Sequence, residues 1–264
     1  MKQRIRPILF CFLLLVSLRG IAQVDTIRVG DHQLLTTRLR PGLTQYLIYM
    51  QDPAHKTELG FWYWLRDISV ETINGSPSIV ISQHWYGSDS TTYREIRSVN
   101  KADDFSPVFH KETSLGKTRA YNWGKEKITG ADTVAGNTIN DFTLNFKAPN
   151  YNWNLDVETF EMLPLSEGKA FAIYFYDAGI DTPQYAVYKV TGSEVLKTLD
   201  NQEADCWKLV TEGQYNTSRY SETYWISKKT HEFLKEEDHY GKVFRLKIRM
   251  PVCSPDLLQL FSAS

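Results

Sequence analysis

The sequence predicts a mainly β protein, either a half-open antiparallel barrel or a strongly curved sheet with one short interrupting helix. Aromatic residues make up 13% of the chain, and flat rings suit a pleated sheet. From residue 45 onward, short runs of alternating apolar and polar residues follow one another, separated by Gly, Asp and Lys clusters. Only residues 150–165, "NYNWNLDVETFEMLPL", depart from this pattern.

The first 22 residues have the pattern of a cleavable secretory signal peptide. Lys2, Arg4 and Arg6 form a positive start, and an apolar run follows at residues 8–18. That run is too short for a stable membrane span, and small residues precede the expected cut after Ala22. We therefore expect a periplasmic or otherwise exported protein.

Two residues near the start bear on how the chain leaves the membrane. Cys11 lacks the small residues that precede a lipidated cysteine, so we expect no lipid anchor. Arg19 lies close to the cut, which leaves an uncleaved anchor as the alternative. After cleavage, residues 23–264 are expected to form a single β-rich domain that is monomeric and has no transmembrane span.

Charge and cysteine content narrow the classes of partner. Removing the signal takes away four positive charges and changes the formal net charge from -1 to -5. A mildly acidic protein has no electrostatic footprint for nucleic acid. Only Cys206 and Cys253 remain of the 3 cysteines, and an exported compartment permits a disulfide between them. The sequence leaves that bond open, because geometry decides it.

The clearest predicted element is a long β-hairpin within residues 60–87. Its first strand alternates between an apolar and a polar parity, which indicates a sheet with one solvated face. Asn74 and Gly75 follow, and both residues tolerate the positive φ that a tight hairpin turn needs. The apolar parity consists of Trp62, Trp64, Ile68 and Val70, and the polar parity of Asp67, Ser69 and Glu71.

The departing segment, residues 150–165, predicts the helix. Asn154 can cap it, and Leu155, Phe160 and Leu163 could share one face. Pro164 limits the helix to about two turns. Strand-like runs resume after it and continue to Met250.

In the last strand, one parity is apolar and the other is cationic. We expect the apolar side chains to face the core and the cationic ones to lie in solvent. The apolar set is Phe244, Leu246, Ile248 and Met250, and the cationic set is Arg245, Lys247 and Arg249.

A transmembrane barrel is the rival fold, but its strands need an uncharged lipid-facing side of about 9–11 residues. Charged residues interrupt the predicted strands too often for that. They include Arg66, Asp67, Glu71, Arg94, Glu95 and Arg97.

No motif for metal binding or catalysis meets its spacing requirement. "HEFLK", from His231, begins like the zincin motif but has Lys235 where the second histidine belongs. Glu158 and Glu161 are weak candidates for paired catalytic carboxylates, with an exposed helix face as the simpler interpretation. The six histidines are scattered, so a Ser–His–Asp set stays open until the fold is known. We expect no metal and no cofactor.

The aromatic residues offer a different kind of site. Large aromatics on strands are more often core than ligand lining. A curved sheet too open to close on its own side chains nevertheless leaves an apolar concave surface, and such surfaces bind ligands. The candidate lining residues are Trp62, Trp64, Trp85, Phe244 and Leu246.

Three segments carry a resemblance to a known family. They are "REIRSVNKADDFSPVFHKE", "FEMLPLSEGKAFAIYFYD" and "DCWKLVTEG…SETYWISKKTHEFLKEEDHYGKVFRLKI". Together they resemble bacterial envelope proteins of the domain-of-unknown-function (DUF) 3108 family, over about residues 45–250. That family looks related in architecture to the lipoprotein carriers LolA and LolB. The resemblance implies a half-open barrel in the periplasm, with no accepted catalytic residues to transfer; the carriers shelter acyl chains against their concave face.

The sequence thus predicts an exported, non-catalytic protein that binds a lipid or an acylated partner such as a lipoprotein on a concave β-surface. A structural or interaction module of the cell envelope without a ligand is the alternative. An exported hydrolase is the third hypothesis.

Overall fold

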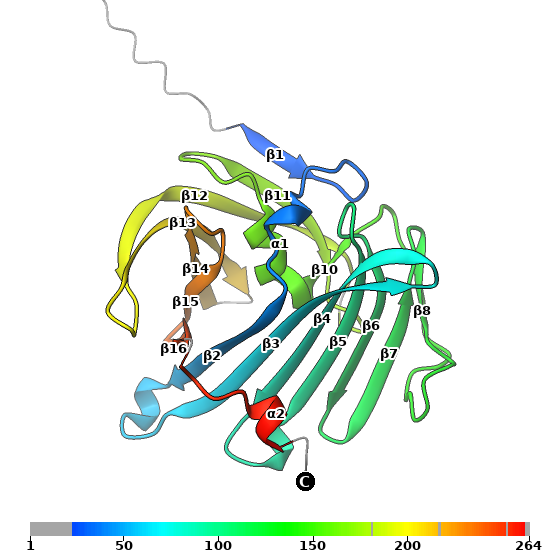
Figure 1. Ribbon diagram of the computed structural model, residues 1–264, viewed down its shortest axis with the longest axis horizontal. Helices are drawn as coiled ribbons and strands as arrows, with labels where there is room; N and C mark the ends of the chain where they lie inside the picture. The colour runs from blue at the N-terminus through cyan, green and yellow to red at the C-terminus, as the bar shows by residue number, and fades with distance from the viewer. Residues whose placement is uncertain (1–22, 181, 216–217, 252, 262–264) are drawn as a thin grey trace, which may run out of the picture.

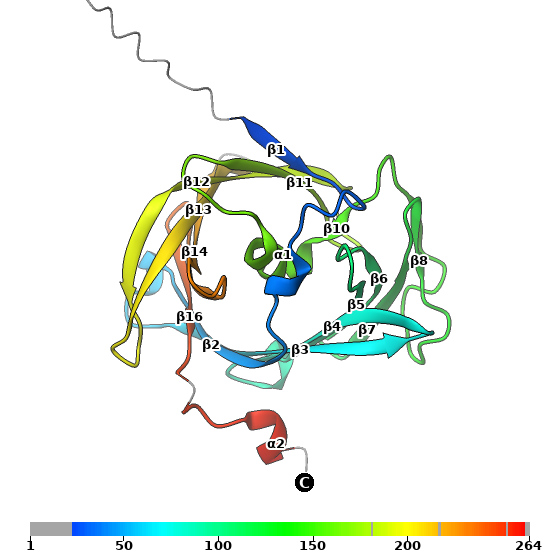
Figure 2. The same cartoon turned by 45° about the horizontal axis from the view of Figure 1, so that its top comes forward.

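The computed structural model describes residues 23–180, 182–215, 218–251 and 253–261, so the predicted signal peptide lies outside it. Within these residues, one 16-stranded sheet, mostly antiparallel, curves around a short central helix (Figures 1 and 2). The expected mainly β fold with a short interrupting helix is therefore confirmed. None of the described helices has the length and apolarity needed to cross a membrane.

The chain enters the sheet in two blocks, which meet where β16 pairs with β2. The first block is β1 (Val24–Ile27), β2 (Gly42–Gln51), β3 (Gly60–Ile73), β4 (Ser76–Tyr86), β5 (Arg94–Lys101), β6 (Pro107–Ser114), β7 (Lys117–Trp123), β8 (Lys127–Gly130) and β9 (Thr143–Asn145). The second is β10 (Tyr151–Asn152), β11 (Ala170–Tyr176), β12 (Gln184–Lys197), β13 (Glu203–Tyr215), β14 (Ser218–Ser227), β15 (Phe233–Tyr240) and β16 (Val243–Arg249). The helical elements are η1 (Thr36–Arg38), η2 (Pro53–His55), η3 (Ser90–Thr92), η4 (Trp153–Leu155), α1 (Asp156–Met162) and α2 (Leu257–Phe261).

The sheet is open along one seam. At one edge, β1 and β10 both pair in parallel with β11. From β11 the order continues through β12 to β16, and then from β2 to β9 at the other edge. Among the described strands no pairing joins β9 to β1 or β10, and side chains bridge the gap instead. Tyr121 donates a hydrogen bond to the carbonyl of Ala178 over 3.2 Å, and the rings of Trp123 and Tyr176 lie 5.6 Å apart.

The predicted long hairpin is confirmed as β3 and β4. Asn74 and Gly75 form its turn with φ angles of 52° and 78°, as two-residue hairpin turns require. Val70 differs from the prediction: it is 61% exposed, since it lies near the exposed tip of the hairpin. Arg66 has the same parity as Trp64, so this charged residue also lies on the inner face, where it is buried.

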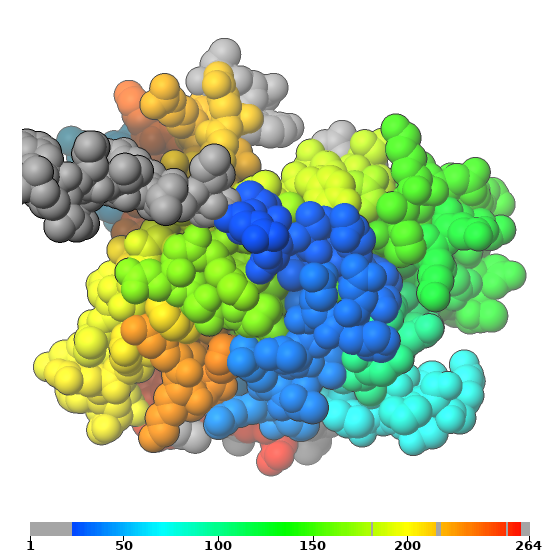
Figure 3. All heavy atoms as spheres, turned by 90° about the horizontal axis from the view of Figure 1, so that it is seen from above, coloured from blue at the N-terminus to red at the C-terminus, as the bar shows by residue number. Residues whose placement is uncertain are grey.

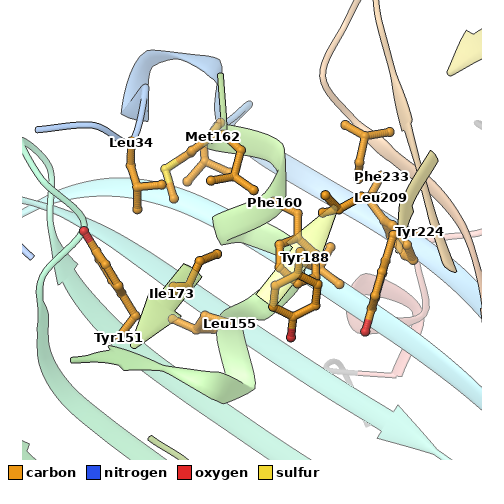
Figure 4. Packing of buried hydrophobic residues seen from close by; sticks show 14 of the residues in the cluster. Leu34, Tyr151, Leu155, Phe160, Met162, Ile173, Tyr188, Leu209, Tyr224 and Phe233 are labelled. Atoms are coloured by element: carbon orange, nitrogen blue, oxygen red, sulfur yellow. The ribbon is translucent and has the colours of Figure 1, made fainter. Parts of the chain in front are cut away.

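The predicted helix forms α1, a seven-residue helix that lies inside the barrel (Figure 2). The side chains of residues 157–162 are all buried. Phe160 packs against Tyr188 of β12 and Tyr224 of β14, with ring centroids 4.5 and 4.8 Å apart (Figure 4). Because a two-turn helix has little stability of its own, this packing holds it in place.

Neighbouring segments fix both ends of α1. Before it, the Asn152 side chain accepts a hydrogen bond from the backbone N–H of Asn154 and caps η4, which leads directly into α1. The predicted cap, Asn154, does not cap α1, which begins without a side-chain cap. After it, the backbone N–H of Leu35 donates to the carbonyl of Met162 over 3.0 Å. The N-terminal segment, in blue, thereby covers one mouth of the barrel (Figure 3).

Candidate functional site

The three tryptophans predicted to line a ligand site belong to the core of the inner face. Trp64 is 2% exposed, and its ring stacks on Tyr46 at 4.7 Å and on Trp85 at 5.1 Å. Trp62 and Trp85 are half-buried against the same core. The concave side of the sheet is filled by α1 and by residues around η1 such as Leu34 (Figure 4). Among the described residues, the expected open concave surface is therefore not present.

The cationic side chains of β16 face inward, which corrects the prediction that they lie in solvent. Lys247 is buried, and its Nζ atom donates to Oε2 of Glu236 over 2.5 Å. Arg245 donates to Glu236 over 3.0 Å and to Asp238 over 2.5 Å. Glu236 and Asp238 are fully buried, so the cations of β16 supply the partners that two buried carboxylates need. Glu236 and Asp238 of β15 are thus interior, whereas Glu237, on the opposite parity, pairs with Lys235 on the outer side.

Because side chains alternate along a strand, the apolar residues of β16 lie on the outer face. Phe244 is half-buried there, with its ring 5.0 Å from that of His239. Leu246 is 7% exposed, but it does not belong to the cluster that surrounds α1. The five predicted lining residues therefore divide between two faces of the sheet.

Glu158 and Glu161 of α1 are buried, which corrects their interpretation as an exposed helix face. Glu161 accepts hydrogen bonds from Nη2 of Arg66 at 2.9 and 3.1 Å and from the backbone N–H of Phe233 at 2.7 Å. Glu158 is 1% exposed and lies 3.8 Å from Nε of Arg66. Neither oxygen of Glu158 has a hydrogen-bond partner among the described residues.

This environment raises the pKa of several carboxyl groups. Burial raises the pKa of Glu158 to about 7, although the charge of Arg66 opposes the shift. Burial likewise raises the pKa of Asp156 to about 7, against the charge of Lys247. Burial and the neighbouring Glu236 raise the pKa of Asp238 to about 8. Burial also disfavours the charge of Glu236, yet Lys247 and Arg245 hold its pKa below the ordinary value.

A cleft of about 870 Å³ opens on the outer face, between the tip of the β12–β13 hairpin and the segment that follows β16. Its floor is apolar and continues the outer side of β2, β15 and β16. The floor consists of Leu43, Leu234, Leu246, Ile248 and Met250, and the walls include Leu196, Leu199, Ala204 and Pro251.

Charged residues of both signs border the cleft, and several of them form ion pairs. The exposed lining residues without an ion pair among the described residues are Lys197, Lys229, Asp200 and Glu203. The border therefore carries little net charge, and the apolar floor is its distinguishing feature. The ion pairs are Lys228–Asp205 at 3.0 Å, Lys235–Glu237 at 2.8 Å and Arg249–Glu232 at 2.9 Å.

One histidine lies beside a serine, as a nucleophilic pair would require. Nδ1 of His110 is 2.8 Å from Oγ of Ser98 and 3.0 Å from Nδ2 of Asn152. Ser98 and His110 are 0% and 1% exposed, and neither lines the outer cleft. Burial lowers the pKa of His110 to about 4. Each of the other five histidines contacts a residue other than a serine. The pairs are His32 with Asp103, His55 with Glu58, His84 with Tyr93, His231 with Arg38 and His239 with Glu237.

The cysteines and the acidic residues form no covalent or metal centre in the described part of the chain. Cys206 is buried and Cys253 is exposed, and both thiols are free, so the disulfide that the sequence left open is not formed. Burial raises the pKa of Cys206 to about 12, as expected for a core thiol. No group of three or more metal-binding side chains occurs among the described residues.

Residues 45–249 match the family described as "Protein of unknown function (DUF3108)". Among solved structures, the chain is similar to a β-barrel-like protein of domain of unknown function DUF1849 from Brucella abortus, with a TM-score of 0.49 and 8% identity over 80% of this chain and 98% of that one. It is also similar to a DUF1329 family protein from Desulfovibrio piger, with a TM-score of 0.26 and 9% identity over 84% and 90% of the two chains. Both similarities are too distant to bear on function. The search of the curated proteins found no match.

Proposed function

This chain belongs to the DUF3108 family, and we propose that it is an exported, non-catalytic protein that binds a hydrophobic ligand in the outer cleft. The observation that supports this is the cleft itself. Its volume of about 870 Å³ is within the range of ligand pockets, and five aliphatic side chains form its floor. The occupant that fits an apolar floor with a border of little net charge is an acyl chain, of a lipid or of an acylated partner.

Binding of a fluorescent long-chain fatty acid to the purified protein tests the proposal. We expect saturable binding that an unlabelled fatty acid displaces. Leu199 is 54% exposed on the cleft wall, so Leu199→Glu should weaken binding about tenfold without disturbing the fold. The matched control is Val187→Glu, because Val187 is 49% exposed on β12 and does not line the cleft. Absence of displaceable probe from the folded protein would overturn the proposal.

Export rests on the sequence pattern of the first 22 residues. Expression of the full chain in a bacterial host, followed by N-terminal sequencing of the periplasmic fraction, tests it. We expect the mature protein to begin at Gln23, and an intact Met1 terminus would contradict a cleaved signal.

A second function is favoured by the filled inner face. With α1 inside the barrel, the protein has a complete core of its own and could serve the envelope as a structural or interaction module. Lipid extraction and mass spectrometry of protein from the native host separate the two functions. Bound lipid supports the ligand function, whereas lipid-free protein that also fails to bind the fluorescent probe supports the module.

A further inference from the structure

The side chains packed around α1 contain more carboxyl groups than cations. The carboxyl groups are Asp156, Glu158 and Glu161 of α1, Glu222 of β14, and Glu236 and Asp238 of β15. The cations are Arg66 of β3 and Arg245 and Lys247 of β16. Tyr46, Tyr188 and Tyr224 face the same space. At the far end of α1, Arg38 donates to the carbonyl of Leu163 and contacts His231, while Arg249 is paired with Glu232.

All three cations are already engaged. Arg66 is bound by Glu161, and Arg245 and Lys247 are bound by Glu236 and Asp238. Glu222 accepts hydrogen bonds from the hydroxyl groups of Tyr224, over 2.7 Å, and Tyr240.

Glu158 is the carboxyl group left with the poorest environment. It is 1% exposed, both of its oxygens lack a hydrogen-bond donor among the described residues, and its nearest cation is shared with Glu161. A buried carboxylate without donors is costly, and binding a proton removes the charge. The interior therefore has more acidic groups than it can hold in ionised form.

We propose that some of the carboxyl groups around α1, Glu158 first among them, bind protons at neutral pH, and that α1 loosens from the barrel when these protons are lost at alkaline pH. The inference concerns the inner face and does not depend on the outer cleft. The helix is the responsive element because its seven residues rely on packing and have little helical stability of their own. The raised pKa values of Asp156, Glu158 and Asp238 agree with the charge imbalance seen in the geometry.

Amide hydrogen exchange of the full-length mature protein, at about pH 6 and about pH 9 and corrected for the intrinsic rates, tests this. We expect protection of α1 to fall more than about tenfold at the higher pH, while that of β3 and β4 changes little.

Glu158→Gln, which cannot ionise, should raise the protection of α1 at alkaline pH by at least about threefold over the wild type. Asp156→Asn is a second variant with the same expected direction, since an amide oxygen can still accept from the backbone of Val157. The matched control is Glu167→Gln, an exposed residue without an ion pair among the described residues.

Three results would overturn the inference. Protection of α1 that is equal at both pH values would show that no ionisation reaches the helix. Equal loss of protection in α1, β3 and β4 would indicate global unfolding rather than release of the helix. A pH dependence that survives unchanged in both Glu158→Gln and Asp156→Asn would assign it to other groups.

Discussion

The Nζ atom of Lys247 lies 2.5 Å from Oε2 of Glu236, and both side chains are buried inside the barrel. Removing one partner of a buried ion pair leaves the other without full compensation. We expect Lys247→Met to lower the free energy of unfolding by about 3 kcal/mol, because Glu236 then keeps only Arg245 as a cationic partner. Urea unfolding measures the change. Lys229→Met is the control, since Lys229 is exposed and has no ion pair among the described residues, and a midpoint shift as large there would contradict the argument.

Leu246 provides a prediction for the outer face. It is 7% exposed and forms part of the cleft floor, so Leu246→Ala should cost about 2–4 kcal/mol of stability. Leu199→Ala, on the exposed wall of the same cleft, should change stability by less than about 0.5 kcal/mol. Both values come from urea titrations monitored by tryptophan fluorescence. Equal effects of the two substitutions would mean that the cleft floor is not packed as described.

Local patterns were sufficient to predict most of the fold. Period-two alternation and the Asn74-Gly75 turn predicted the β3–β4 hairpin, and the helical segment before Pro164 predicted α1. These features depend on neighbours along the chain, which a sequence displays directly. The position of α1 inside the barrel depends on contacts between distant segments, such as Phe233 with Glu161, which a single sequence does not reveal.

The orientation of the side chains of β16 shows why the site could not be predicted. When apolar and cationic residues alternate along a strand, the apolar side chains are expected to face the core, but in β16 the cationic side chains face inward. The signal that could have corrected it is in the preceding strand, where Glu236 and Asp238 share one parity and form cross-strand contacts with Lys247 and Arg245. Leu246 and Ile248 then belong to the outer face, where the cleft lies.

Stability should depend on pH in a direction set by the interior carboxyl groups. The pKa values of Asp156 and Glu158 are raised to about 7 and that of Asp238 to about 8, so the folded state holds protons that the unfolded state has lost. The free energy of unfolding should therefore fall as the pH rises from about 5 to about 8. Glu158 alone accounts for about 2–3 kcal/mol of this fall.

Urea midpoints measured at several pH values test this dependence. Two groups act in the opposite sense at the acid end: burial lowers the pKa of His110 to about 4, and the cations beside Glu236 lower its pKa. Each loses stabilisation as the pH falls, and the three raised carboxyl groups outweigh His110 above about pH 5, so maximum stability is expected at or below about pH 5. Glu158→Gln should flatten the decline above that maximum. Stability that rises steadily from about pH 5 to about pH 8 would contradict the raised pKa values.

The Ser98–His110 pair is the place where a serine nucleophile can be tested. The distance of 2.8 Å between Oγ and Nδ1 suits a nucleophile and its base, but both side chains are buried, and Asn152 also contacts Nδ1. A nucleophile must be reachable by its substrate, so we expect a fluorophosphonate probe to leave Ser98 unmodified in the folded protein. Ser98→Ala should instead lower the free energy of unfolding by about 1–2 kcal/mol through the lost hydrogen bond. Mass spectrometry locates any modification, and stoichiometric labelling of Ser98 in the wild type, absent from Ser98→Ala, would establish an accessible nucleophile and contradict a non-catalytic role.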